Sequence, residues 1–199
     1  MHRQELLSLL QNHRTHFMEE AAYVRRARSF VEAHPDCFER SLLPAHVTGS
    51  AWVVNPDRSC ALLLHHRKLN QWFQPGGHAD GETDILGVAL RESAEETGVD
   101  PAHIHLIDSR IFDVDIHSVS LPTQPLHEHI DIRFLLEIDS DIDAPGNHES
   151  NEVRWVPLHA VTRFNNNRST YRMVEKTRRL RNAGAAEAAP SRKRKALMR

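Results

Sequence analysis

Residues 76–99, with the sequence GGHADGETDILGVALRESAEETGV, constrain the fold more than any other part of the chain. The segment opens on a glycine-rich loop. Apolar residues then recur at helical spacing, from Thr83 or Asp84 to Thr97. Gly98 follows, and glycine is the usual residue where a helix ends in the left-handed conformation. The sequence therefore predicts a loop that leads directly into an amphipathic helix.

The expected helix carries three acids, Glu92, Glu95 and Glu96, at spacings that place them on one face. Like charges at these spacings repel each other by a few tenths of a kcal/mol per pair. A hard divalent cation such as Mg²⁺, which prefers oxygen ligands, would neutralise them. The alternative is a solvated acidic face in which Arg91 pairs with Glu95 one turn away.

The same segment resembles the signature of the Nudix hydrolases, G-x5-E-x7-R-E-U-x-E-E-x-G-U, where U is a bulky apolar residue. The likeness is specific over about 24 residues and extends more weakly over about residues 47–160. It implies a Nudix-type α/β/α sandwich around a mixed β-sheet. The positions that match without a gap are Gly77, Arg91, Glu92, Glu95, Glu96, Gly98 and Val99.

The sequence departs from this signature at two positions. The first glutamate of the pattern falls on Thr83, with Glu82 and Asp84 on either side. In the family that glutamate is thought to brace the arginine that corresponds to Arg91, so here Glu82 or Asp84 is the candidate for that role. The second departure is Ser93 in place of a bulky apolar residue, which suggests a less tightly packed side of the helix.

The resemblance implies metal-dependent hydrolysis of a pyrophosphate bond in a nucleoside diphosphate linked to another moiety. By position, Glu92 and Glu96 would be the principal ligands of Mg²⁺, or of Mn²⁺, and Glu95 a further ligand. Glu152, near the end of the chain's strand region, is a candidate extra ligand or general base, with Glu149 as the alternative. Alternatively, Glu152 is an ordinary solvated acid without a role in the site. These four glutamates, Glu92, Glu95, Glu96 and Glu152, form the candidate catalytic set.

A different class of function also suits the chain. The departures at Thr83 and Ser93 leave room for a catalytically weak, Nudix-like module that binds a nucleotide or metabolite without turnover. The three clustered acids of the helix count against this alternative, because a pure binding module has no need for them.

Histidines form a second group of candidates. His78 lies in the glycine-rich loop, and in the sequence HEHID the side chains of His127, His129 and Asp131 alternate, so they should share one side of an extended strand. We expect His78, His127 and His129, with Gly77 and Arg91, to contact the substrate phosphates, or the histidines to bind a second metal. Zinc would require three or four convergent ligands. The alternative is a set of solvent-facing strand residues.

The remaining pattern predicts two helices before residue 34, a hairpin of strands at 47–55 and 60–65, further strands at 104–114, 130–138 and 153–156, and a last helix at 169–181. Trp72, just before the glycine-rich loop, could stack on a base or belong to the core. We divide the chain into an N-terminal helical extension (1–46), a Nudix domain (47–182) and a flexible basic tail (183–199). The N-terminal pair could serve as a homodimer contact or a lid.

Charge is divided unevenly along the chain. Residues 163–199 carry a net charge of +10, whereas residues 1–162 carry −12. The basic cluster at 192–195 could contact RNA, but it lacks interleaved aromatics, so we expect a small-molecule substrate and not a nucleic acid. No apolar stretch is long enough to span a bilayer, so no membrane partner is expected, and two cysteines favour a reducing cytoplasm.

Overall fold

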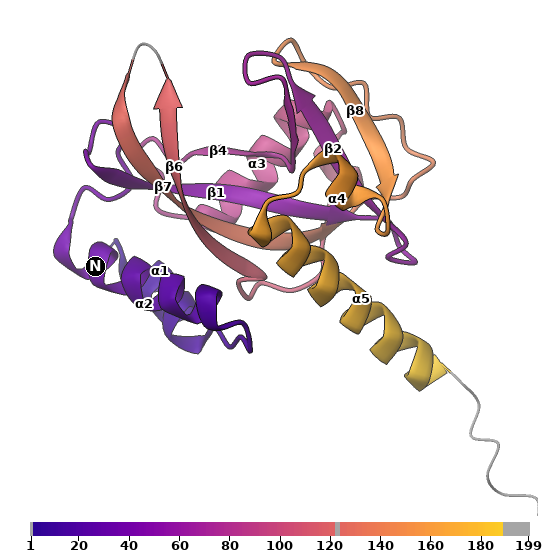
Figure 1. Ribbon diagram of the computed structural model, residues 1–199, viewed down its shortest axis with the longest axis horizontal. Coiled ribbons are helices and arrows are strands. Elements are labelled where there is room, and N and C mark those ends of the chain that lie inside the picture. Colours follow the sequence, from indigo (N-terminus) through magenta and orange to yellow (C-terminus); the bar gives the residue numbers. More distant parts are fainter. Residues whose placement is uncertain (1, 122–123, 189–199) are drawn as a thin grey trace, which may run out of the picture.

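The computed structural model describes residues 2–121 and 124–188 and consists of a mixed sheet covered by helices on both faces (Figure 1). The main path through the sheet runs β3-β2-β1-β7-β5; β4 also pairs with β1, β6 with β7 and β8 with β2. The strands are β1 (Ala45–Val54), β2 (Cys60–His66), β3 (Gln71–Phe73), β4 (Gly76–His78), β5 (His105–Leu106), β6 (Asp113–Leu121), β7 (Gln124–Glu137) and β8 (Ser150–Pro157). The helices are α1 (Gln4–Asn12), α2 (Met18–Ala33), α3 (Ile85–Thr97), α4 (Val161–Phe164) and α5 (Arg168–Ala188), with a 3₁₀ turn at Pro101–His103.

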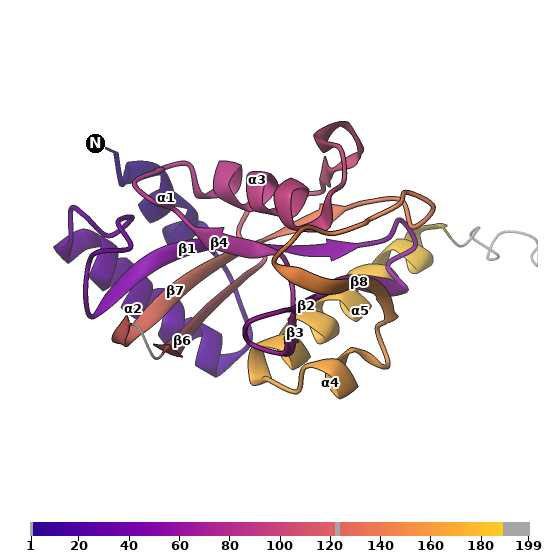
Figure 2. The same cartoon turned by 90° about the horizontal axis from the view of Figure 1, so that it is seen from above.

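Helices α3 and α5 lie on opposite faces of the sheet, so the α/β/α expectation is confirmed (Figure 2). Strand β1 is buried along its whole length and runs parallel to β7. Because side chains alternate along a strand, Gly49 faces α3 while Trp52 faces α5. Trp52 donates a hydrogen bond from Nε1 to Thr177 of α5 at 2.9 Å. The central strand therefore presents a different chemical surface to each side.

The predicted hairpin of β1 and β2 forms only at its turn, where Val54 is opposite Ala61. Beyond this point β2 pairs with β8 and β3, while β4 pairs with β1 near Gly49. The short strand β4 lies within the stretch predicted to be a loop. Glycines allow this because their backbone can approach a neighbouring strand closely.

The strand predicted at 104–114 is wrong in its position. Within this range the strands are β5 and the first two residues of β6, and between them the chain turns at Asp108, whose Oδ1 accepts a hydrogen bond from the backbone N–H of Arg110. Short aspartate side chains favour such turns because they satisfy the backbone locally. The long strand is β6, which begins at Asp113 and pairs antiparallel with β7.

The last helix, α5, is longer than the sequence predicted and includes residues 183–188, which we had assigned to the tail. This extension is rich in alanine, the residue with the highest helix propensity, which explains its conformation. Residues 189–199, with the basic cluster at 192–195, lie outside the described residues. Within the described part of the chain, the helices are too short or too polar to cross a membrane.

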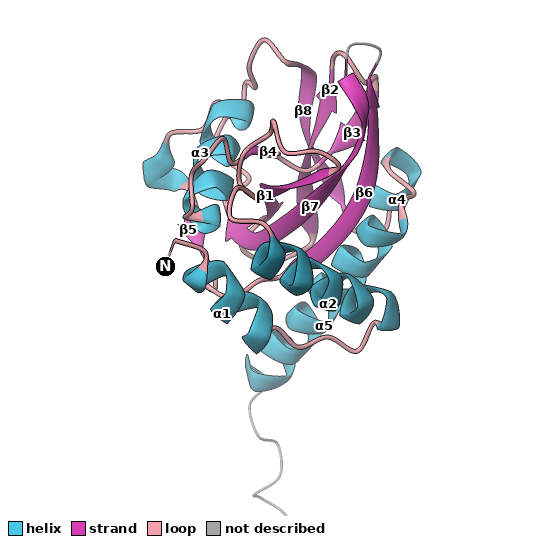
Figure 3. Ribbon diagram, turned by 90° about the vertical axis from the view of Figure 1, so that its left-hand side faces the viewer, coloured by secondary structure: helices cyan, strands magenta, loops and turns pink. Residues whose placement is uncertain are grey.

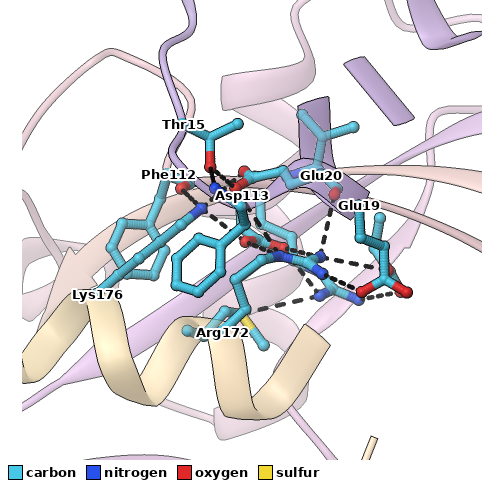
Figure 4. Close-up of polar contacts among 12 residues, drawn as sticks. Thr15, Glu19, Glu20, Phe112, Asp113, Arg172 and Lys176 are labelled. Carbon is cyan, nitrogen blue, oxygen red and sulfur yellow. Dashed lines mark hydrogen bonds and ion pairs between the residues drawn. The ribbon is translucent and has the colours of Figure 1, made fainter. Parts of the chain in front are cut away.

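Both predicted N-terminal helices are present and pack beside the β6–β7 end of the sheet (Figure 3). Their apolar side chains share one buried cluster with α3, β6 and β7. The start of α2 also meets α5 through ion pairs (Figure 4). The ammonium group of Lys176 donates to Glu20 at 2.6 Å and to Asp113 at 2.7 Å. The extension is thus attached by both apolar packing and buried charge.

These ion pairs belong to a larger buried set, which we call the charge network. Arg133 of β7 donates to three carboxylates, those of Asp131 at 2.7 Å, Asp115 at 3.2 Å and Asp113 at 3.3 Å. Arg172 of α5 donates to Asp113 at 2.8 Å. The members of the network are Glu20, Asp113, Asp115, Asp131, Arg133, Arg172 and Lys176.

Candidate active site

Helix α3 has a local signal at each end. Asp84 is its N-cap, and Oδ1 of Asp84 accepts a hydrogen bond from the backbone N–H of Gly87 at 2.9 Å. Gly98 ends the helix with φ of 71°, a left-handed conformation that glycine adopts without strain. Between these ends, Ile85 and Val88 are buried against β1. The helix is therefore fixed both in length and in rotation.

This rotation places Glu92 and Glu96 beneath the two glycines of β4. The backbone N–H of Gly76 donates to Oε2 of Glu96 at 2.8 Å. A Cβ atom at Gly77 would lie only 2.4 Å from Cδ of Glu92, so a larger residue could not occupy this position without displacing the carboxylate. The structure therefore brings Gly77, Glu92 and Glu96 together.

Of the two carboxylates, Glu92 has a cationic partner in Arg91, at 2.7 Å, whereas Glu96 is bonded to the neutral backbone N–H of Gly76. Burial raises the pKa of Glu96 to about 8; the hydrogen bond from Gly76 opposes this shift, and the charges of Glu92 and Glu149 add to it. Burial also raises the pKa of Glu92, although Arg91 opposes the shift. Buried oxygen donors that favour protonation in the absence of a cation suit a hard divalent ion. The donor set therefore fits Mg²⁺ or Mn²⁺.

The other two candidate acids lie in more open surroundings. The side chain of Glu95 is 58% exposed and interacts with Arg91 at 3.4 Å. Glu152 on β8 is exposed and accepts a hydrogen bond from Nε of Arg154 at 2.6 Å. The negative charge of Glu149 raises the pKa of both Glu92 and Glu96. Glu149 therefore has a stronger electrostatic effect on Glu92 and Glu96 than Glu152 has.

Arg91 contacts neither of the acids considered as its brace. Its guanidinium donates to Glu92 at 2.7 Å and, at 3.4 Å, to the backbone carbonyl of His78. Asp84 instead caps the helix. Arg91 therefore connects α3 to β4 through Glu92 and the carbonyl of His78, so a glutamate in place of Thr83 is not required for this contact.

Ser93, where the sequence suggested a less tightly packed side of the helix, lies on the buried side of α3. Ser93 is fully buried, and its Oγ has no hydrogen-bond partner within the part of the chain that the structure describes. The side chain at this position is therefore enclosed by the protein and not exposed to solvent.

The alternation predicted for HEHID is present in β7. His127 is 4% exposed, and His129 lies in the same cluster of rings. They meet His46 at the start of β1, with ring centroids 5.0 Å and 4.9 Å away. We call His46, His127 and His129 the histidine cluster. Asp131 shares their side of the strand but belongs to the charge network, where it also accepts hydrogen bonds from Thr48 and Ser50.

His78 lies at the edge of the histidine cluster, with its ring centroid 4.9 Å from that of His129. Burial lowers the pKa of His78 to about 4 and that of His129 to about 2, and neighbouring positive charges contribute to both shifts. Sequence reasoning missed His46, because a single histidine before an apolar strand carries no signal. Only the parallel pairing with β7, which places His46 opposite His129, reveals it.

Trp72 of β3 is half-buried and packs on the cluster that includes Trp52 and Met173. One side of its ring is stacked on His65, at 5.1 Å between centroids. The Arg154 guanidinium lies 5.4 Å from the centroid of the Trp72 ring. Its surroundings therefore favour the packing role over an open stacking platform for a base.

The fold and the glutamate helix together define a Nudix protein. The family model for the NUDIX domain matches residues 44–177, which is more than half of the chain, and the chain belongs to this family.

Its relatives include enzymes named for pyrophosphate chemistry. A probable DHNTP pyrophosphohydrolase of Lactococcus lactis subsp. cremoris (strain MG1363) is 29% identical over 47% of this chain and 54% of the relative. An asymmetrical bis(5'-nucleosyl)-tetraphosphatase of Sus scrofa is 28% identical over 61% of this chain and 74% of the relative. The chain thus spans about half the length of the first of these relatives.

Among solved structures, an Ap4A hydrolase binary complex from C. elegans has a TM-score of 0.56 and 16% identity. The matched region covers 69% of this chain and 98% of the C. elegans hydrolase chain. At this identity the likeness shows the fold alone.

Proposed function

We propose that this protein hydrolyses a phosphoanhydride bond in a small substrate that carries a pyrophosphate group, with the help of a divalent cation. One observation carries the proposal: the partly buried carboxylate of Glu92 and the buried carboxylate of Glu96 converge beneath the glycines of β4, where Arg91 is bonded to Glu92 and the backbone N–H of Gly76 to Glu96. Family membership supports the same chemistry. The relatives' names, a tetraphosphatase and a pyrophosphohydrolase, favour a chain of linked phosphates as the group that is recognised.

Glu92 and Glu96 would hold Mg²⁺ or Mn²⁺, with Glu95 as a more exposed further ligand. A bound cation of this kind neutralises the anhydride and lowers the pKa of water. The backbone N–H of Gly76 orients Glu96, and Arg91 orients Glu92. The absence of a side chain at Gly77 leaves room for the carboxylate of Glu92.

Other residues would contribute outside the carboxylate pair. His78 borders the site through its contact with Arg91. Glu149 is the better placed candidate for the general base, and Glu152 remains the second candidate. The substrate expected from the family resemblance is a nucleoside diphosphate linked to another moiety. A reducing compartment such as the cytoplasm suits the two free cysteines, Cys37 and Cys60.

The test is hydrolysis of a panel of substrates by the full chain with Mg²⁺ or Mn²⁺. The panel holds dinucleoside polyphosphates, nucleoside diphosphate sugars and nucleoside triphosphates. We expect Glu96→Gln to lower kcat/KM at least about 100-fold, or about 2.7 kcal/mol, because it removes a buried ligand but keeps an acceptor for Gly76. The matched control is Glu175→Gln on α5, which removes an exposed acid far from the site.

Equal rates for the wild type, Glu96→Gln and Glu175→Gln would contradict the proposal. Tight nucleotide binding without hydrolysis would instead support the binding-module alternative. Calorimetric titration with Mn²⁺ gives a second readout that does not depend on choosing the right substrate. We expect cation binding to weaken in Glu96→Gln and to remain unchanged in Glu175→Gln.

A further inference from the structure

The histidine cluster has the features of a metal site and is separate from the glutamates of α3. His46 and His127 are 1% and 4% exposed. One potential ligand atom from each of His46, His127 and His129 lies within 4.8 Å of the others. Ligand nitrogens around zinc sit about 2.1 Å from the ion, so about 3.4 Å from each other in a tetrahedron. The three rings therefore need to close by only about an ångström to share one ion.

The hydrogen bonds of these rings leave nitrogen lone pairs free. Nδ1 of His46 contacts the carbonyl of Leu42 at 3.3 Å, and Nδ1 of His127 contacts the carbonyl of Pro125 at 2.8 Å. A carbonyl only accepts, so each Nδ1 is the protonated donor and each Nε2 carries the lone pair. A backbone carbonyl bound to the other ring nitrogen is the usual support for a histidine that ligates a metal.

Two ring nitrogens are also left unsatisfied. Nε2 of His46 and Nε2 of His129 are buried and have no hydrogen-bond partner among the residues that the structure describes. Leaving a buried polar atom without a partner destabilises the fold, so such atoms call for a partner. Neutral imidazole is the form that binds metals, and a lone pair on Nε2 is what such an ion would use.

The cluster and the carboxylate pair lie on opposite faces of β1. The backbone of α3 packs over Gly49, whereas His46 is three residues away and so points to the other face. Its partner in the register, His129, shares that face. An ion held by imidazoles would thus not be the one held by Glu92 and Glu96.

We propose that His46, His127 and His129 bind a divalent transition-metal ion such as Zn²⁺ or Co²⁺. Imidazole ligands select these ions over Mg²⁺, which prefers oxygen. Three protein ligands leave a fourth position open on zinc. The ring of His78 packs against those of His46 and His129, so His78 is a candidate for that position beside water or a small anion.

The test is titration of the full, metal-stripped chain with Co²⁺, followed by the visible absorption of the bound ion and by calorimetry with Zn²⁺. With millimolar Mg²⁺ present to occupy the carboxylates of α3, we expect one Co²⁺ per chain and a spectrum typical of a four-coordinate nitrogen site. His46→Asn and His127→Asn each keep a donor near the Nδ1 position and remove Nε2, so each should weaken binding at least about 10-fold. His148→Asn changes an exposed histidine and should bind as the wild type does.

Two further measurements keep the result independent of folding defects and of the glutamates. Zn²⁺ should raise the melting temperature of the wild type and of Glu96→Gln equally, and millimolar Mg²⁺ should not displace Co²⁺. Equal Co²⁺ affinity in the wild type, His46→Asn and His127→Asn would overturn the proposal. So would loss of Co²⁺ binding in Glu96→Gln, or a wild type that binds no ion and gains no thermal stability.

Discussion

Two groups of buried polar side chains lie next to each other on one face of β7, and they differ in whether their buried polar atoms have partners. In the charge network, Arg133 is 3% exposed and its guanidinium is surrounded by three carboxylates. In the histidine cluster the rings are all of one kind, and Nε2 of both His46 and His129 lacks a partner among the described residues. In the network, the buried charge of Arg133 is paired with carboxylates of this same chain. The cluster is incomplete without a further group, and this contrast is what marks it as a site.

The largest effect is expected from removing the centre of the charge network. Arg133→Met leaves three buried carboxylates without their shared cation, so it should lower the free energy of unfolding by about 3–5 kcal/mol. Urea denaturation followed by circular dichroism measures this change. Arg179→Met removes an exposed arginine paired with Glu175 and should change stability by less than about 0.5 kcal/mol. Equal stability of the two variants would show that the network does not hold the fold together.

A second prediction concerns acid and tests the same network at α2. Burial alone would raise the pKa of Glu20, but hydrogen bonding to His13 and the charge of Lys176 outweigh it and lower the pKa to about 2. A lowered pKa stabilises the fold above the unfolded value of about 4.5, and this contribution is lost as pH falls from about 4.5 towards 2. It amounts to about 3 kcal/mol.

Unfolding free energies at a series of pH values check this prediction. Glu20→Gln should show a shallower loss of stability over that range than the wild type. Glu175→Gln, which alters an exposed acid, should follow the wild-type curve. Identical slopes for Glu20→Gln and the wild type would mean that Glu20 is not held in its charged form by Lys176.

A third prediction extends the comparison to the carboxylates of α3. The pKa of Glu96 is raised, so ionising this carboxyl opposes folding. The contribution of the protonated carboxyl to stability is fully present below about pH 4.5 and is lost as pH rises through about 8. In chelator-treated protein at pH 8, Glu96→Gln should therefore be more stable than the wild type by about 2 kcal/mol. Thermal melts at pH 5 and pH 8 measure it, and an advantage of equal size at both values would refute the explanation.

The smallest effect is expected in the histidine cluster of metal-stripped protein. His46→Asn removes a nitrogen that has no partner and keeps a donor for the carbonyl of Leu42, so it should cost about 1 kcal/mol, mainly from lost packing. Chemical denaturation with chelator present measures this. A loss as large as that of Arg133→Met would show that the cluster, like the network, is already complete.

Much of the catalytic helix could be predicted from the sequence, because its signals are local. The acids at Glu92 and Glu96, the apolar face and the stop at Gly98 all lie within a few turns, and the family signature covers the same residues. The resemblance also supplied the fold class. Local periodicity and a short motif are enough wherever the structure depends on near neighbours.

The histidine cluster and the charge network could not be predicted in this way, since they depend on pairing between distant strands. His46 meets His129 only because β1 runs parallel to β7, although the two residues are 83 positions apart in the sequence. Likewise, Lys176 reaches Glu20 across most of the chain. The short strand β4 was missed for the same reason, because it forms by pairing with β1. The strand predicted at 104–114 was misplaced for a different reason, a local turn at Asp108.

The attachment of α2 to α5 has a consequence for the size of the unit that folds. A fragment limited to residues 44–177 would keep Arg172 and Lys176 yet lose Glu20, together with the apolar side chains of both N-terminal helices. It would also end α5 in its middle. Recombinant fragments trimmed to the family boundary should accordingly be less soluble than the whole chain, because the unit that folds is longer than the region that the family model matches.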